Sequence, residues 1–598
     1  MVFAWVQPWG KYVCRRGKVE AVAEYDLKIV NGRIVDGTGA PPYSADIGIK
    51  DGRIVRIGQL GDTSAGDTID AGGRYVGPGF IDVHTHYDVQ IFRDPGLSEA
   101  LQNGTTAVAM GNCGISIAPC KPEAQARERC MLMLEATEQI PMPVQRESIP
   151  WGWESFPEFM EVLRRTPKSL NLMMYAPLAT IHVYVMGADE TKRRDATPAE
   201  RAEMKRLVSE AMDAGAAGLS LCFMKEANNH FDYDGTPLPT DLMPIDHIVE
   251  IASVLKERGD GVIQCLTGRP GFDPTVELSE RLAREVGRPI LHNFLPAGHE
   301  GGRNGLAWHQ RMNDEGHQVY SQAFNGRFWG EISLITAVCH DANPVWRRLS
   351  SGDGDSREAL RLLRDPAFRH EMRLAYDQVA FDQTNGALEQ MTFVQAGKAV
   401  AWEPWLDKTL SVIAAETGKN IVDVYADINL ESEGEAVFKT SPVSVDLDVV
   451  KRQLEHERII LSGSDGGAHI KAIANGVWPT DLLIWLVRDE KVLTVERAHH
   501  LMSYLPSRAM GLRDRGAVLE GQAADLVIYD LAELYFDMRR MWHSYDLPQG
   551  DWRKRSRAGG YFRVLVNGVV VYDCDRYTGA DAGQVISPSP VTRRLERA

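Results

Sequence analysis

Short apolar runs that alternate with helix-forming stretches constrain the fold of this chain more than any other feature. Buried strands alternating with helices indicate βα units and a parallel sheet. The stretch Pro198–Ala214 fits a crossover helix, because one stripe carries Met204, Leu207, Val208, Ala211 and Met212. Eight such strands are the count of a (β/α)8 barrel. The eight runs are Phe80–His86, Thr105–Met110, Leu172–Tyr175, Ala217–Cys222, Gly261–Cys265, Pro289–His292, Gln318–Gln322 and Ile459–Ser462.

Both ends of the chain show a second pattern, in which apolar and polar residues alternate between turn signals. Asp26–Val35 and Ala45–Gly58 have it near the start, with hairpin signals at Asn31-Gly32 and Asp51-Gly52. Ala524–Tyr529 and Phe562–Tyr572 repeat it near the end, again with an Asn-Gly pair. A few hairpins alone bury too little surface to be stable. We therefore expect the two ends to pair into one small β-sandwich domain.

These patterns predict an α/β fold, a TIM-type barrel with a composite β-domain and a helical insertion. The barrel is expected over 79–510 and the β-domain over 26–78 plus 511–580, with an N-terminal extension (1–25) and a C-terminal tail (581–598). The insertion, at about 325–449, is rich in aromatic residues and helix formers and contains no convincing strand. Two interpretations of it stay open, a lid over the barrel mouth and a contact between copies of the chain.

Composition and charge limit the class of protein. The chain is 44% hydrophobic and 25% charged, as in an ordinary globular protein. Its formal net charge of -16 argues against nucleic acid or an anionic membrane as the main partner. The 8 cysteines form no Cys-x-x-Cys pair, and neither a signal peptide nor a long apolar run is evident. We expect a cytoplasmic protein with a small-molecule partner, and a homo-oligomer stays open.

Two histidines follow the first apolar run, in the stretch Gly79-Phe-Ile-Asp-Val-His-Thr-His86. Side chains of a strand alternate between its faces, so His84 and His86 are expected on one side and Thr85 on the other. Two imidazoles placed in this way can hold one metal ion. Because ligands on barrels lie where strands end, this position favours a metal site over two histidines that merely cap a buried strand.

The histidine segment resembles the first barrel strand of the amidohydrolase superfamily. Later stretches resemble its N-acyl-D-amino-acid deacylase (D-aminoacylase) branch, and the similarity extends from about Tyr25 to Gly579. Members of that branch combine a (β/α)8 barrel with a small β-domain and hydrolyse amides with zinc. The stretches that carry this resemblance are Gly111-Asn-Cys-Gly114, Ser462-Gly-Ser-Asp-Gly-Gly-Ala-His469 and Gly521-Gln-Ala-Ala-Asp-Leu-Val527.

The resemblance implies roles for several residues. Cys113 falls where the branch has a metal-binding cysteine, although a lone cysteine is more often a small buried hydrophobe. His292 falls on a zinc-binding histidine of the branch, and Asp465 falls where the superfamily has its general base and a metal ligand. The fifth run departs from the branch, because Gln264-Cys-Leu266 contains no histidine. Three weaker candidates are Cys265 as a substitute ligand, Lys225 as a carboxylated bridge between metals, and His469 as a substrate contact.

These residues support a hydrolase that cleaves an amide, such as an N-acyl-(D-)amino acid, with zinc-activated water and Asp465 as general base. Other amides, a carbamate or a lactone are alternative substrates. The missing fifth-run histidine leaves a second class open, a non-catalytic ligand-binding or assembly protein on the same fold. We expect one tightly bound Zn2+ per chain, with any second ion weak and exchangeable.

Overall fold

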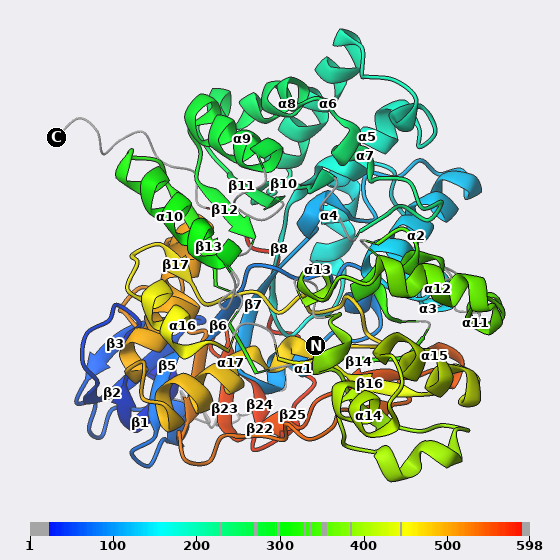
Figure 1. The fold of residues 1–598 in the computed structure, drawn as a ribbon. Helices are drawn as coiled ribbons and strands as arrows, with labels where there is room; N and C mark the ends of the chain where they lie inside the picture. The colour runs from blue at the N-terminus through cyan, green and yellow to red at the C-terminus, as the bar shows by residue number, and fades with distance from the viewer. Residues whose placement is uncertain are drawn as a thin grey trace, which may run out of the picture.

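The computed structural model describes residues 23–588, apart from 226–229, 268–272, 294, 296–299, 324, 328, 335, 342, 350–355, 383–385 and 443–444. Most of the expected N-terminal extension and the last ten residues of the expected tail therefore lie outside the described residues. The fold is mixed α/β, with helices packed around two parallel sheets and a larger sheet at one side (Figure 1). None of the helices in the described ranges combines the length and apolar character needed to cross a bilayer.

Two parallel sheets form the centre of the molecule, and each of the eight predicted runs overlaps one of their strands. The first sheet has the order β6 (Phe80–Asp82), β7 (Thr105–Met110) and β8 (Asn171–Met174). The second has the order β17 (Ile459–Ile460), β13 (Val319–Gln322), β12 (Ile290–Asn293), β11 (Val262–Thr267), β10 (Gly218–Phe223) and β9 (Ala176–Pro177). The predicted parallel strands are therefore confirmed.

The two parallel sheets meet at both of their edges. Tyr175 alone separates β8 from β9 along the chain. At the other edge, the segments that follow β6 and β17 pair, because His86 N donates to Gly466 O (2.7 Å) and Asp465 N donates to His84 O (3.1 Å). The carboxyl ends of the first and the last strand therefore lie side by side.

Alternate strand residues face two different cores. One small cluster, on one face of the strands, includes Ile81, Ala107, Met173, Val262, Leu291 and Ile460. The residues between them face the surrounding helices, such as α4 (Phe156–Arg165), α8 (Ile245–Arg258) and α10 (Glu300–Asp314). The predicted crossover helix is α6 (Pro198–Asp213), which begins with a capping box at Thr197 and Glu200. The five residues of its predicted apolar stripe are all buried, which confirms the helical prediction.

A nine-stranded sheet joins the two ends of the chain, as the sequence predicts. Its path is β25-β24-β23-β18-β5-β1-β2-β3, and β4 (Ala65–Asp70) pairs with β1. β5 (Tyr75–Pro78) and β18 (Leu526–Tyr529) pair antiparallel and connect the two halves. The remaining strands are β1 (Tyr25–Ile34), β2 (Tyr43–Lys50), β3 (Arg53–Gly58), β23 (Tyr561–Val566), β24 (Val569–Asp573) and β25 (Arg576–Tyr577).

One of the predicted hairpin turns is wrong. Asp51-Gly52 does connect β2 and β3, and Asn567-Gly568 connects β23 and β24. Asn31-Gly32 instead lies inside β1, where the register with β2 shifts between Ile29 and Gly32. Asn31 has a φ of 56°, so the pair forms a bulge within a continuous strand.

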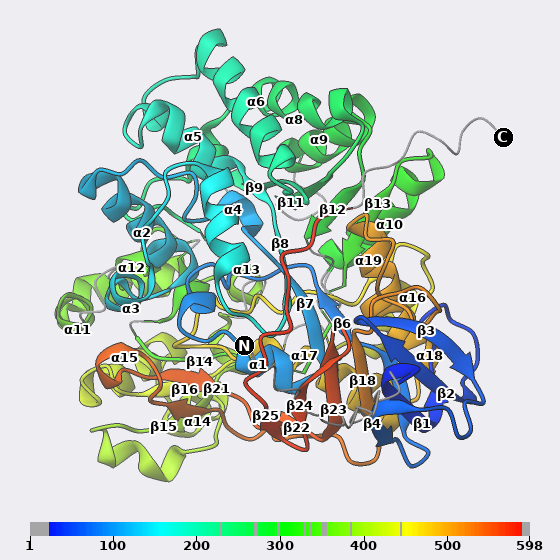
Figure 2. The ribbon, with the colours of Figure 1, turned by 180° about the vertical axis from the view of Figure 1, so that it is seen from behind.

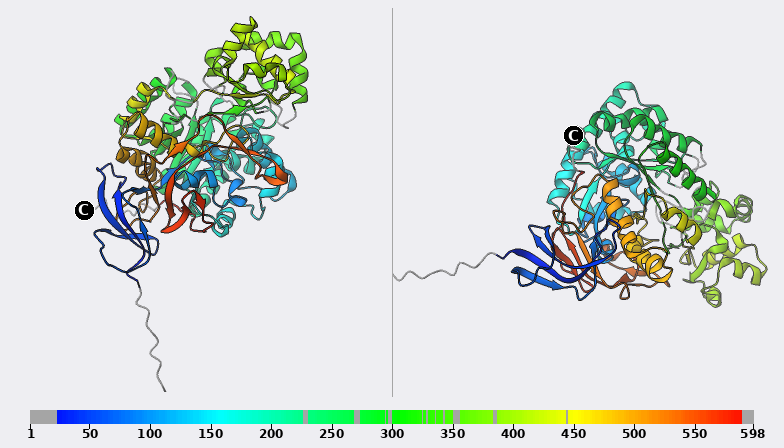
Figure 3. Two further views of the ribbon diagram at one scale, coloured as in Figure 1. Left: turned by 90° about the horizontal axis from the view of Figure 1, so that it is seen from below. Right: turned by 90° about the vertical axis from the view of Figure 1, so that its left-hand side faces the viewer.

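The segment between β13 and β17 forms a separate lobe, seen in yellow-green in Figure 3. Its helices include α11 (Arg357–Arg364), α12 (Pro366–Ala375), α14 (Leu410–Thr417) and α15 (Ile421–Glu431), packed around Trp346, Phe393, Tyr425 and Phe438. The expectation that this insertion has no strand is wrong. β14 (Glu331–Ile332), β15 (Thr392–Gln395) and β16 (Val437–Lys439) form an antiparallel sheet, whose strands are too short to give a periodic signal.

Residues between β18 and β23 leave the nine-stranded sheet and contact this lobe. They form two short sheets, β19 (Tyr535–Phe536) with β22 (Ala558–Gly559) and β20 (Trp542–Ser544) with β21 (Arg553–Arg555). Lys554 Nζ lies 2.7 Å from Glu331 Oε2, and both side chains are buried. The C-terminal segment, in red in Figure 2, then runs past β8, where Ile586 N donates to Leu172 O (2.8 Å).

We predict that a fragment comprising residues 79–510 does not fold stably. It lacks Val527, Tyr529, Tyr561 and Val564, which are fully or almost fully buried in the main core. Each large apolar side chain contributes about 1.5–3 kcal/mol when buried, and a domain is stable by only about 5–15 kcal/mol. Calorimetry should show no cooperative unfolding of the fragment. A soluble fragment with a sharp transition would show that both chain ends are dispensable.

Candidate metal centre

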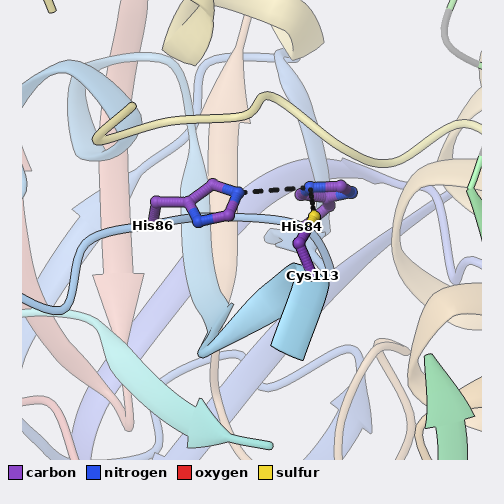
Figure 4. A group of neighbouring side chains, drawn as sticks. All are labelled: His84, His86 and Cys113. Atoms are coloured by element: carbon purple, nitrogen blue, oxygen red, sulfur yellow. Dashed lines mark hydrogen bonds between the residues drawn. The ribbon is translucent and has the colours of Figure 1, made fainter. Parts of the chain in front are cut away.

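His84 and His86 lie just beyond β6, and Thr85 between them fixes their orientation. Thr85 donates to Ala109 O through its backbone N (3.1 Å) and through Oγ1 (2.7 Å). With Thr85 turned to β7, both imidazoles project on the other side, and their Nε2 atoms lie 3.4 Å apart (Figure 4). The structure therefore brings the two histidines together as the sequence predicts.

Cys113 reaches His84 from the turn that follows β7. Its Sγ lies 3.6 Å from His84 Nε2, as Figure 4 shows. Asn112 ties this turn to the histidine segment by donating to Thr85 O (3.1 Å) and Ala109 O (2.9 Å). Cys113 has a φ of 57°, in the left-handed region that is strained for a residue with a side chain. Burial raises the pKa of the Cys113 thiol well above its usual value.

Asp465 completes the group from the loop that follows β17. Its Oδ1 lies 3.5 Å from His84 Nε2 and 3.2 Å from His86 Nε2. Burial acts to raise the pKa of Asp465, but the hydrogen bond and charge of His86, with His84, keep it below its usual range. Gly467 lets this loop lie against the histidine segment, because a Cβ there would be 2.4 Å from His86 O.

Four of the six separations among the four donor atoms agree with a tetrahedral metal site. The edge of a tetrahedron is about 1.6 times its bond length, so bonds of about 2.0–2.3 Å give edges of roughly 3.3–3.8 Å. His84 Nε2 lies 3.4 Å from His86 Nε2 and 3.6 Å from Cys113 Sγ. Asp465 Oδ1 lies 3.5 Å from His84 Nε2 and 3.2 Å from His86 Nε2. Two imidazoles, a thiolate and a carboxylate are ordinary ligands of a divalent transition metal. The residues present therefore fit such an ion.

Glu138 is a further member of the site that the sequence does not reveal. It ends α2 (Ala124–Glu138), is only 2% exposed, and its Oε1 lies 3.5 Å from His86 Nδ1. Burial raises the pKa of Glu138 to about 7. A carboxylate beside the second nitrogen of a ligand histidine holds that ring in place. No spacing rule relates a helix end to a strand 50 residues earlier, so no sequence signal indicates this contact.

Two more buried carboxylates hold the backbone around the site. Asp82 accepts from Trp478 Nε1 (3.1 Å) and from His84 N (3.1 Å). Asp88 accepts from Ser116 Oγ (2.5 Å) and from Gly111 N (3.3 Å), which fixes the start of the Cys113 turn. Both residues orient chain segments that carry donor atoms.

His292 and Cys265 do not join the four donor atoms. The His292 ring packs on Trp308 with centroids 4.9 Å apart, and burial lowers its pKa to about 4. Cys265 hydrogen-bonds Ser279 of α9 (Asp273–Arg281). Both side chains face the helices because they alternate with residues that face the interior. The structure therefore does not support either as a ligand.

The remaining candidates lie at different distances from the centre. Lys225 is held elsewhere, since its Nζ donates to Asp241 O (3.3 Å) and lies over the Phe223 ring. His469 is a neighbour of Asp465, with His469 Nε2 3.8 Å from Asp465 Oδ2. Its Nδ1 lies 3.0 Å from Gln139 Oε1, so it connects Asp465 to the residue after Glu138.

Three side chains that the sequence interpretation passed over contact the donor residues. Asn293 Nδ2 lies 2.6 Å from His84 Nδ1, and Gln264 Oε1 accepts from Cys113 N (2.9 Å). Gln322 also hydrogen-bonds His84. Strand alternation gives the signal that finds them, because each stands two residues after an interior apolar residue.

Comparison with known proteins gives consistent results. Two models of the amidohydrolase family match residues 67–241 and 370–571, and one of the urease alpha-subunit N-terminal domain matches residues 12–79. D-aminoacylase of Alcaligenes xylosoxydans xylosoxydans is 28% identical, over 94% of this chain and 98% of the relative. N-acyl-D-aspartate deacylase of the same organism is also 28% identical, over 95% of this chain and 96% of the relative.

A solved structure supports the same fold. N-acyl-D-glutamate deacylase from Bordetella bronchiseptica, in complex with zinc and a phosphonate inhibitor, superposes with a TM-score of 0.61. The two sequences are 23% identical, and the match covers 94% of this chain and 99% of that structure. The two amidohydrolase family matches together cover more than half of the chain, and the full-length relatives support the D-aminoacylase-like branch, so this chain belongs to the amidohydrolase family.

Proposed function

We propose that this chain is a zinc-dependent hydrolase that cleaves the amide bond of an N-acyl-D-amino acid. The observation that carries this proposal is the convergence of Cys113 and Asp465 on His84 and His86, with donor atoms 3.2–3.6 Å from those of the histidines. The full-length D-aminoacylase and N-acyl-D-aspartate deacylase relatives support the substrate class. Nitrogen and sulfur donors together favour zinc over harder ions such as magnesium.

We further propose that the two parallel sheets form one closed (β/α)8 barrel with this site at its carboxyl-terminal mouth. The hydrogen bonds between the ends of β6 and β17 and the continuity of β8 into β9 support closure. The nine-stranded sheet would then be a β-sandwich domain built from 26–78 with parts of 511–580. Residues 535–559 stand outside it, because they contact the insertion.

The proposed chemistry divides between the ion and the protein. Zinc at this place supplies Lewis acidity, polarising the scissile carbonyl and activating water at neutral pH. Asp465 is the member of the donor set that a substrate can reach, since its side chain is 27% exposed while that of His86 is 2% exposed. With Oδ1 turned to the histidines, Oδ2 takes the proton of the attacking water and returns it to the leaving nitrogen. His469 beside Oδ2 holds the carboxylate in position.

Loss of either histidine should abolish tight metal binding. In His84→Ala and His86→Ala the site loses an imidazole ligand, so zinc affinity should fall at least 100-fold. The histidines follow β6 and lie outside the apolar clusters, so thermal unfolding of the metal-free proteins should change by only a few degrees. Metal analysis and calorimetry check this. Stoichiometric zinc in the double variant would locate the ion elsewhere.

The substrate proposal is tested by a hydrolysis screen of N-acyl-D-amino acids, their L-isomers, other amides, carbamates and lactones. We expect the D-isomers to be cleaved fastest, and Asp465→Asn to lower kcat on them by about 10²–10⁴, the range for losing a general base. Preference for another class would overturn the substrate assignment. Full activity of Asp465→Asn would remove Asp465 from the mechanism.

One zinc per chain should be sufficient for activity. Among the described residues His84, His86 and Cys113 form one group of possible ligands, and Asp465 Oδ1 lies within 3.5 Å of both histidines. A single zinc ion there supplies both effects that amide hydrolysis needs. After chelation, activity should return in full with one equivalent of zinc, and a second equivalent should bind more weakly. Two ions that survive brief chelation, with a carboxylated Lys225 seen by mass, would contradict this prediction.

A further inference from the structure

Three neighbouring strands each carry a buried carboxamide on the interior side, as the last residue of β12 and of β13 and in the middle of β11. Gln264 on β11, Asn293 on β12 and Gln322 on β13 are 0%, 0% and 1% exposed. Gln264 and Asn293 stand two residues beyond Val262 and Leu291 of the small apolar cluster, and Gln322 stands two residues beyond Tyr320, which packs against that cluster. Because strand side chains alternate, the same face that packs the interior carries the amides to the mouth.

These amides contact His84 and Cys113, whereas Glu138 contacts His86. The shortest contact joins Asn293 to His84 Nδ1 at 2.6 Å. Within the described residues, each amide also has one buried atom without a hydrogen-bond partner: Gln264 Nε2, Asn293 Oδ1 and Gln322 Nε2. Buried polar atoms without hydrogen-bond partners are rare in folded proteins, so three of them beside the donor residues need a chemical explanation.

The chemistry of His84 defines what Asn293 must do. The nitrogen that faces the other donor atoms is Nε2, so a metal ion there needs the Nε2 lone pair. A neutral imidazole with a free Nε2 carries its proton on Nδ1, which is then a donor. Its partner must therefore be an acceptor. The Asn293 oxygen, now without a partner, reaches this place by a half-turn of the amide about its Cβ–Cγ bond.

We propose that Asn293 is a positioning residue for the metal centre, whose side-chain oxygen accepts the Nδ1 proton of His84 and so presents Nε2 to the ion. This inference rests on the proposed function, because it needs an ion at His84. An amide does this without adding a negative charge beside Cys113, Asp465 and Glu138. Glu138 does the corresponding work for His86, with a carboxylate.

The test compares two replacements of Asn293 in the full-length protein. Asn293→Leu keeps the shape but has no acceptor, so zinc affinity should fall about 10–100-fold, as when a partner behind a ligand histidine is lost. Asn293→Asp keeps an oxygen acceptor, so its affinity should stay within about threefold of the original. Zinc affinity is measured by competition with a chromophoric chelator, independently of catalysis.

His292→Leu is the matched control. It also introduces a leucine into β12, one residue away, but on the face that packs against Trp308. Its zinc affinity should equal that of the original protein. Thermal unfolding of all zinc-free variants separates loss of the site from loss of the fold, and Asn293→Ala replaces Asn293→Leu if the leucine variant does not fold.

The outcomes distinguish the inference from the proposed function. Unchanged zinc affinity in Asn293→Leu, or in Asn293→Ala, overturns the positioning role. An Asn293→Asp variant as weak as Asn293→Leu overturns it too, because the amide would then act as a donor. If one of these two results is found while the original protein binds zinc and cleaves amides, only the inference about Asn293 fails. If the original protein binds no zinc, the proposed function fails and the inference fails with it.

Discussion

The structure depends on one backbone contact between segments about 380 residues apart. His84 O and His86 N are hydrogen-bonded to Asp465 N and Gly466 O, which places the residues after β6 beside those after β17. Without that contact, nothing would hold the Asp465 carboxylate beside the imidazoles of His84 and His86. The left-handed conformations of Cys113, Asp465 and His469 show that the neighbouring turns are held in a demanding geometry around it.

The buried acidic side chains at this centre favour the binding of a cation. Cys113, Asp465 and Glu138 lie within one small region, and burial raises the pKa of the Cys113 thiol and of Glu138. A divalent ion offsets the charge of a thiolate and a carboxylate together, so binding releases protons from the site. The neutral amides of Gln264, Asn293 and Gln322 add contacts to His84 and Cys113 without adding to the negative charge.

The sequence predicts the strands and the common side of His84 and His86 well, because both follow local rules. The eight apolar runs and the His84-x-His86 spacing are properties of short segments, and the structure has strands in all eight. The prediction of a turn at Asn31-Gly32 was wrong because an Asn-Gly pair is typical of both a hairpin turn and a β-bulge. His292 lies away from the donor atoms, against Trp308. A resemblance between sequences predicts the position of a ligand only to within about one residue. One residue along a strand reverses the face, and it is Asn293 that points inward. Glu138 was beyond prediction, since its contact with His86 exists only in the tertiary fold.

The central claim is that one zinc ion is held by His84, His86, Cys113 and Asp465. X-ray absorption at the zinc edge of the zinc-loaded protein tests it most directly. We expect one sulfur ligand at about 2.3 Å from the zinc, with nitrogen and oxygen ligands at about 2.0–2.1 Å. The sulfur signal should vanish in Cys113→Ser. A shell with no sulfur, or a second metal at about 3.5–4 Å from the first, would contradict it.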